Sequence, residues 1–154
     1  MNSEQICGIL EKNYLSEDTQ EKDALCNFHL LLNSETIFID VGANIGQYTS
    51  QANKIIRTGS IYAIEPDPAR FALLKENCQK WETLSRNTIH TLNIAISARN
   101  SKNEPFYITN SPVSSFGVKY DLSNLEDELR EAVVWQEIAV ASHKLDTLFK
   151  TIDP

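Results

Sequence analysis

The chain has 154 residues, of which 42% are hydrophobic and 23% charged, and a formal net charge of -7. This length and composition predict a soluble globular protein of one domain with a single core. The negative charge and the lack of any basic run argue against a nucleic-acid partner, because phosphate binding needs clustered Lys and Arg. No apolar stretch reaches about 18 residues, so no membrane span is predicted. Residues 1–12 carry no evident signal peptide, and we expect a cytoplasmic location.

The first 34 residues are predicted to form a helical segment. Apolar residues recur there at three- and four-residue intervals, among them Ile6, Ile9, Leu10, Leu25, Phe28, Leu31 and Leu32. The polar stretch 15–19 separates two predicted helices. We favour a packing role at one edge of a sheet over a substrate lid or an oligomerisation arm.

Residues 36–50 predict a buried strand that leads through a tight loop into a helix. The apolar run 36–39 ends in Asp40 and favours a strand covered on both faces, as in a parallel sheet. Gly42 and Gly46 give the loop backbone freedom and let a ligand approach where a Cβ would collide. A helix is expected over residues 47–56. Asp40 therefore lies at the carboxyl end of its strand, where open α/β sheets bind ligands.

A second strand is predicted over residues 60–64, and it ends in Glu65. An acidic residue at this place can accept two hydrogen bonds from the hydroxyls of a ribose. Pro68 suits the first turn of the next helix, and Asp67 can cap it. The cap role of Asp67 is favoured over a role near adenine. Together with the preceding loop, these residues describe a βαβ nucleoside site.

Further strands, a loop and a helix are predicted in the rest of the chain, which shows no motif of a second catalytic site. A third strand is expected over residues 88–97, and the segments 104–109 and 136–140 are expected to pair antiparallel. Residues 110–117 read as a surface loop, with a substrate-contacting lid as the alternative, and residues 123–134 as a capped helix.

Neither the histidines nor the cysteines form a recognisable site. His29 falls in a helix, His90 in a strand and His143 in a polar turn, and their spacing predicts no metal set. The cysteines, Cys7, Cys26 and Cys78, include no Cys-x-x-Cys pair and are expected to be small buried hydrophobes. Ser114 and Ser115 lack the G-x-S-x-G elbow of a hydrolase.

The glycine spacing bears on which nucleoside is bound. The dinucleotide fingerprint G-x-G-x-x-G is poorly matched, because Asn44 and Gln47 stand where its second and third glycines belong. The loop resembles motif I of the class I S-adenosylmethionine-dependent methyltransferases. Four strings resemble the FkbM family of that class: residues 38–49 (FIDVGANIGQYT), 63–68 (AIEPDP), 93–97 (NIAIS) and 144–148 (KLDTL).

This resemblance implies a three-layer, Rossmann-like α/β fold with S-adenosylmethionine as cofactor. It implies O-methylation of a hydroxyl on a sugar or another small-molecule acceptor. The residues that it places at the cofactor are Asp40, Gly42, Ala43, Asn44, Gly46, Tyr48, Glu65, Pro66, Asp67, Asn93 and Ala95.

The family's next core strand would begin near Thr151, so residues 35–154 are expected to be a partial methyltransferase domain, incomplete on one side. The missing strand would leave an open sheet edge that could pair with a complementing chain or a second copy. Two alternatives stay open. One is a non-catalytic remnant or partner-binding protein with this half-fold, and the other is an NAD-dependent oxidoreductase, which the glycine spacing disfavours.

Overall fold

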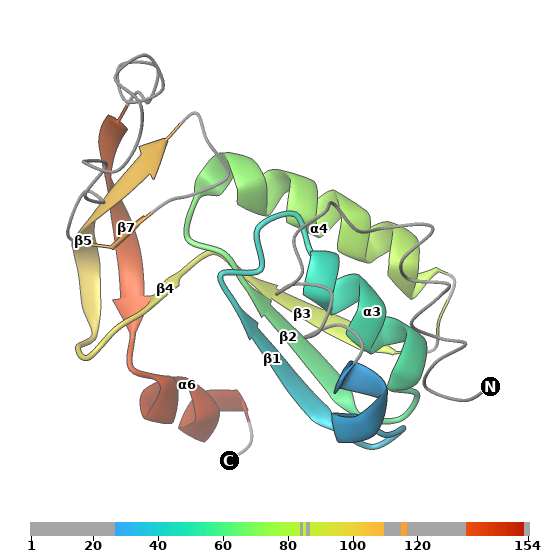
Figure 1. The fold of residues 1–154 in the computed structure, drawn as a ribbon. Helices are drawn as coiled ribbons and strands as arrows, with labels where there is room; N and C mark the ends of the chain where they lie inside the picture. The colour runs from blue at the N-terminus through green and yellow to red at the C-terminus, as the bar shows by residue number, and fades with distance from the viewer. Residues whose placement is uncertain (1–26, 84, 86, 110–114, 117–134, 153–154) are drawn as a thin grey trace.

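The computed structural model describes residues 27–83, 85, 87–109, 115–116 and 135–152. These residues form two sheets (Figure 1): a three-stranded sheet of order β1-β2-β3 and a four-stranded sheet of order β4-β7-β5-β6. The expected helix at 123–134 and most of the first 34 residues lie outside the described residues. So does the predicted loop at 110–117, except for the short strand β6 (Ser115–Phe116).

The three-stranded sheet is wholly parallel and alternates with helices. Along the chain it runs β1 (Ile37–Val41), α3 (Gln47–Ile55), β2 (Ser60–Ile64), α4 (Pro68–Glu82) and β3 (Thr88–Leu92). Right-handed crossovers that advance in one direction place successive helices on the same face of a sheet. Both α3 and α4 accordingly lie on one face (Figure 1). The expected Rossmann-like βαβ arrangement is confirmed.

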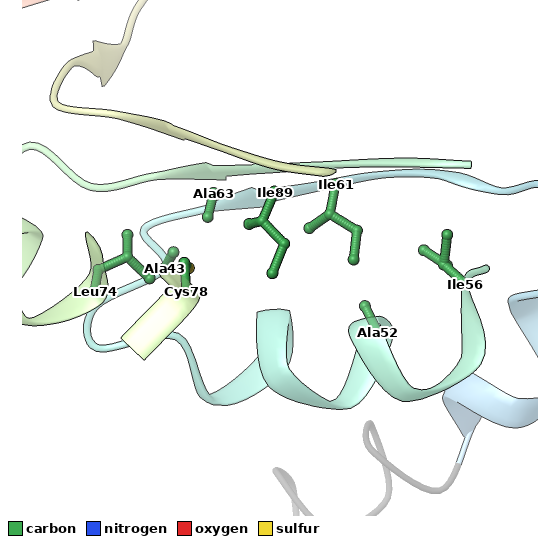
Figure 2. Packing of buried hydrophobic residues seen from close by; sticks show 8 residues of the cluster. All are labelled: Ala43, Ala52, Ile56, Ile61, Ala63, Leu74, Cys78 and Ile89. Atoms are coloured by element: carbon green, nitrogen blue, oxygen red, sulfur yellow. The ribbon is translucent and has the colours of Figure 1, made fainter. Parts of the chain in front are cut away.

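The main core lies between this sheet and its two helices. Figure 2 shows Ile61, Ala63 and Ile89 pointing from the strands toward the helices. Ala52 of α3 and Ile56, which directly follows α3, meet the strand side chains from below, and all five residues are buried. Leu74 and Cys78 of α4 complete the same cluster. Burial of these side chains on one face fixes which face each strand residue occupies.

The other face of β1 is open, which corrects the expectation that this strand is covered on both faces. Ile37 is 56% exposed and Val41 is 54% exposed. Both belong to the set of alternate residues that points away from α3 and α4, whereas Phe38 and Asp40 belong to the covered set. The continuous apolar run predicted a strand covered on both faces, whereas the described residues cover only one face of β1. Among the described residues, α3 and α4 cover one face of this sheet, which is consistent with the expected partial Rossmann-like fold.

The four-stranded sheet contains β4 (Ala95–Ile96), β5 (Ser101–Thr109) and β7 (Trp135–His143), besides β6. The predicted antiparallel pair is confirmed, because β5 and β7 pair antiparallel with Phe106 opposite Ile138. Ala95, Phe106 and Val140 form a second small core. The helix α6 (Leu145–Ile152) follows β7.

Two strand predictions are wrong in detail. The strand expected over residues 88–97 divides after Leu92, and Ala95 then pairs with Ser142 of β7 in the other sheet. The division occurs at Asn93, whose side-chain amide donates to the carbonyls of Glu65 and Pro66 and so ties the chain to the β2 end. His143 lies at the end of β7 and not in a turn.

The described part of the N-terminal segment is a helix at residues 27–31 that packs on the main core. The Phe28 ring meets Phe38 of β1 with centroids 5.3 Å apart and Tyr48 of α3 at 5.6 Å. Leu32 packs against the same core cluster. A packing role, as favoured from the sequence, describes these residues.

Gly46 offers a test of how closely α4 packs on the loop before α3. Its φ is +96°, and an added Cβ would lie 2.8 Å from Leu74 and 2.9 Å from Trp81. Gly46→Ala should therefore lower the free energy of unfolding by about 2–4 kcal/mol, from left-handed strain plus overpacking. Gly42→Ala is the matched control, since a Cβ at Gly42 meets nothing within 4 Å and φ is +79°. It should cost only the backbone strain of about 1–2 kcal/mol. Equal losses in urea unfolding would contradict the packing argument.

Candidate functional site

The candidate site lies at the carboxyl ends of β1 and β2. The two strands are parallel neighbours, with Asp40 opposite Ala63 and Val41 opposite Ile64. Glu65 directly follows Ile64, so both acids lie at the same edge of the sheet. The expectation that these two strands deliver their terminal acids to one side is confirmed. This edge is where open α/β sheets bind ligands.

The loop from β1 to α3 folds back onto the end of β2. The N–H groups of Gly42 and Ala43 both donate to the Ile64 carbonyl at 2.9 Å. Gly42, Asn44 and Gly46 all have positive φ, of 79°, 53° and 96°. Asn is one of the few non-glycine residues that adopt this left-handed region readily. Asn44 therefore meets the same backbone requirement that a glycine would meet at this place.

The two glycines serve different purposes, which corrects part of the sequence interpretation. Gly42 is exposed, and open space lies where its Cβ would be, as expected for close approach of a ligand. Gly46 is buried, and its Cβ would collide with Leu74 and Trp81 of α4. The close contact at Gly46 is therefore with α4 and not with a ligand.

Asp40 caps α3 from the strand. The N-cap residue of α3 is Gly46, which has no side chain to accept a hydrogen bond. Instead, Oδ2 of Asp40 accepts from the Thr49 N–H at 3.0 Å and from the Thr49 hydroxyl at 2.6 Å. Asp40 is only 8% exposed. Burial raises the pKa of Asp40, and the two Thr49 bonds act in the opposite direction. A negative charge is thereby placed at the positive end of the helix dipole.

Glu65 joins the glycine loop to the loop before α4. Its Oε2 accepts from the Asn44 N–H at 2.8 Å, and its Oε1 accepts from the Asp67 N–H at 2.9 Å. The residue is 4% exposed. Burial raises the pKa of Glu65, while both N–H bonds and the charge of Arg70 lower it. The Glu65 carboxylate thus connects the two loops through hydrogen bonds to both.

The FkbM methyltransferase domain matches residues 40–154, which is most of the chain. The chain belongs to the FkbM methyltransferase family.

A search of curated proteins found no match. Among solved structures, the precorrin-6y C5,15-methyltransferase of Geobacter metallireducens GS-15 is 23% identical, with a TM-score of 0.39. That similarity covers 51% of this chain and 41% of the other, so it spans less than half of the solved protein.

Three further predicted site residues of this FkbM domain, Pro66, Asp67 and Asn93, belong to or contact the segment between β2 and α4. Asp67 is the N-cap of α4, with Oδ1 accepting from the N–H groups of Ala69 and Arg70, and the predicted cap role is therefore observed. Pro66, which lies between Glu65 and Asp67 in the sequence, is half-buried. Asn93 donates to the backbone of this same loop.

Two predicted residues face elsewhere. Tyr48 packs on Phe28 of the N-terminal helix, although it belongs to the first turn of α3. Ala95 is buried in the second core with Phe106 and Val140. Their contacts in this FkbM domain are with its own side chains, and a role at the cofactor stays a prediction for both.

The sequence interpretation missed Thr49. Its signal is nevertheless present: a hydroxyl residue in the first turn of a helix whose N-cap position is a glycine, following a strand that ends in a carboxylate. Among the residues that the structure describes, no three His, Cys, Asp or Glu side chains are grouped to hold a metal ion. No helix in the described ranges is long and apolar enough to span a membrane.

The cap of α4 can be tested by substitution. Asp67→Ala should reduce the free energy of unfolding by about 1 kcal/mol, because two N–H groups at the start of α4 lose their acceptor. Asp67→Ser retains a capping oxygen and should recover most of this loss in chemical denaturation. If the serine variant were as unstable as the alanine variant, capping would not be the source of the effect.

The buried Glu65 predicts a pH dependence of stability. Its pKa is raised above the ordinary 4.5 in the folded state, so stability contributed by its protonated form is lost as pH rises through the folded pKa. Wild type should therefore lose stability relative to Glu65→Gln across this range, as measured by urea unfolding at stepped pH. Glu76→Gln is the control, because Lys80 lowers the pKa of exposed Glu76 and reverses the slope. A constant difference between wild type and Glu65→Gln would contradict the prediction.

Proposed function

We propose that this FkbM domain binds S-adenosylmethionine at the Asp40–Glu65 edge and methylates a hydroxyl group of a sugar or another small molecule. The observation that carries the proposal is the pair of acids on adjacent parallel strands, with the glycine loop between them. When bound, the cofactor supplies a methyl group made electrophilic by its sulfonium. The chain then has mainly to bind and orient the reactants.

The negative charge of Asp40, at the start of α3, supports this cofactor over a dinucleotide. A pyrophosphate binds at a helix N-terminus through free N–H groups and the positive end of the dipole. At α3 the Asp40 carboxylate already lies at that end and accepts the Thr49 N–H. A second anion there would meet a like charge at close range. S-adenosylmethionine can turn its ammonium toward this acid, whereas a pyrophosphate has no cationic group to offer there.

The acceptor capacity of Glu65 fits a ribose. An ionised carboxylate offers about four lone-pair directions, and the two N–H groups of Asn44 and Asp67 use one on each oxygen. One direction on each oxygen is left for the two hydroxyls of a ribose. The open space beside Gly42 leaves room for the methionine portion. Asp40, Gly42, Asn44 and Gly46 would hold that portion, and Glu65 the ribose.

A second candidate function is a non-catalytic, partner-binding role. It is favoured by β1, which is an edge strand of the sheet that the described residues form and which exposes Ile37 and Val41. Such an edge can accept a strand from a complementing chain or a second copy. Binding of the cofactor separates the two functions, because a partner-binding remnant has no need of it. The mass of the protein in solution would test the pairing itself.

Titration calorimetry with S-adenosylmethionine, S-adenosylhomocysteine and NAD tests the proposal. We expect binding of the first two ligands and none of NAD. Glu65→Ala should abolish measurable binding, whereas Glu76→Ala, on the exposed face of α4, should bind as wild type does. NAD binding by the wild type, or full affinity in Glu65→Ala, would overturn the assignment.

A further inference from the structure

Thr49 makes two hydrogen bonds to Asp40. It is completely buried, at 0% exposure, and both of its donors meet a single oxygen, Oδ2 of Asp40. In the described part of the chain Asp40 Oδ1 accepts no hydrogen bond. The carboxylate is therefore held through one oxygen, and the lone pairs of the other remain available.

We propose that Thr49 is a positioning residue of the adenosyl site, which fixes the Asp40 carboxylate so that Oδ2 caps α3 and Oδ1 stays available to a positively charged ligand group. This inference rests on the proposed function, in which that group is the ammonium of the methionine portion. The hydroxyl is the essential part. It makes the shorter of the two contacts with Oδ2, 2.6 Å against 3.0 Å for the N–H, and so adds a second restraint on the carboxylate.

The surroundings of Asp40 leave Thr49 as the group that sets its orientation. On the α4 side the nearby titratable group is Cys78, whose pKa is raised to about 12 by burial and by the charges of Glu82 and Asp40. This thiol is neutral throughout the range in which Asp40 titrates. The titration of Asp40 therefore reports its contacts with α3 and its burial.

The first experiment follows the Asp40 carboxyl carbon by NMR in the ligand-free protein as pH is lowered. Thr49→Val retains the side-chain shape and the N–H but lacks the hydroxyl, so the pKa of Asp40 should rise above the wild-type value. Thr49→Ser retains the hydroxyl and should titrate like wild type. An unchanged Asp40 titration in Thr49→Val would overturn the inference.

The second experiment measures the affinity of the same variants for S-adenosylmethionine and S-adenosylhomocysteine, both of which carry the ammonium. Thr49→Val should bind each about tenfold more weakly, the size expected when a hydrogen bond to a charged group is disturbed. Thr49→Ser should recover the affinity. A purely structural role would lower the urea midpoint of Thr49→Val and leave the affinity of its folded form unchanged, which would overturn the inference.

Two further outcomes are decisive. If Thr49→Val does not fold, Thr49→Ala removes the hydroxyl without facing a methyl group against the carboxylate, and the same two readouts apply to it. If the wild type binds neither adenosyl ligand, the proposed function fails, and the Asp40 titration still decides whether Thr49 controls the carboxylate.

Discussion

The candidate site depends on two buried carboxylates that hold backbone N–H groups from neighbouring loops. Asp40 accepts from the first turn of α3, and Glu65 accepts from the glycine loop and from the loop before α4. An irregular loop has N–H groups that regular structure does not satisfy, and a buried one left unpaired is costly. The two acids meet this requirement from the strand ends. The shape of the loop is thus a consequence of where β1 and β2 stop.

The same arrangement supports the proposed class of ligand. Both acids are nearly excluded from solvent, and burial raises the pKa of each. Their charged forms are therefore maintained by hydrogen bonds rather than by water. A cationic or hydroxyl-bearing ligand adds partners to such groups, whereas an anion adds repulsion. Electrostatics and loop geometry thus support the same class of ligand in this FkbM domain.

Much of this could be predicted from the sequence because the signals are local. The apolar run before Asp40, the Asp67–Pro68 start of α4 and the order of strands and helices follow from patterns within a few residues. The purpose of Gly46 could not be predicted, since it depends on Leu74 and Trp81, which are distant in sequence.

Other features depended on contacts between different secondary-structure elements. The division of the third predicted strand at Asn93 required knowing that its amide would meet the carbonyls of Glu65 and Pro66. Thr49 was missed because a threonine inside a helix is no signal by itself and becomes one only together with the glycine N-cap and Asp40. Its importance depends on a carboxylate nine positions earlier.

The left-handed backbone of Asn44 bears on how related chains are recognised. Asparagine and glycine are nearly interchangeable at such a position, so a single replacement by glycine would create the Gly-x-Gly spacing of a dinucleotide loop without altering the path of the chain. Counting glycines would then assign such a homologue to the wrong group of nucleotide-binding proteins. The contact of Thr49 with Asp40 involves neither side chain at position 44, so the start of α3 would be held in the same way in either case.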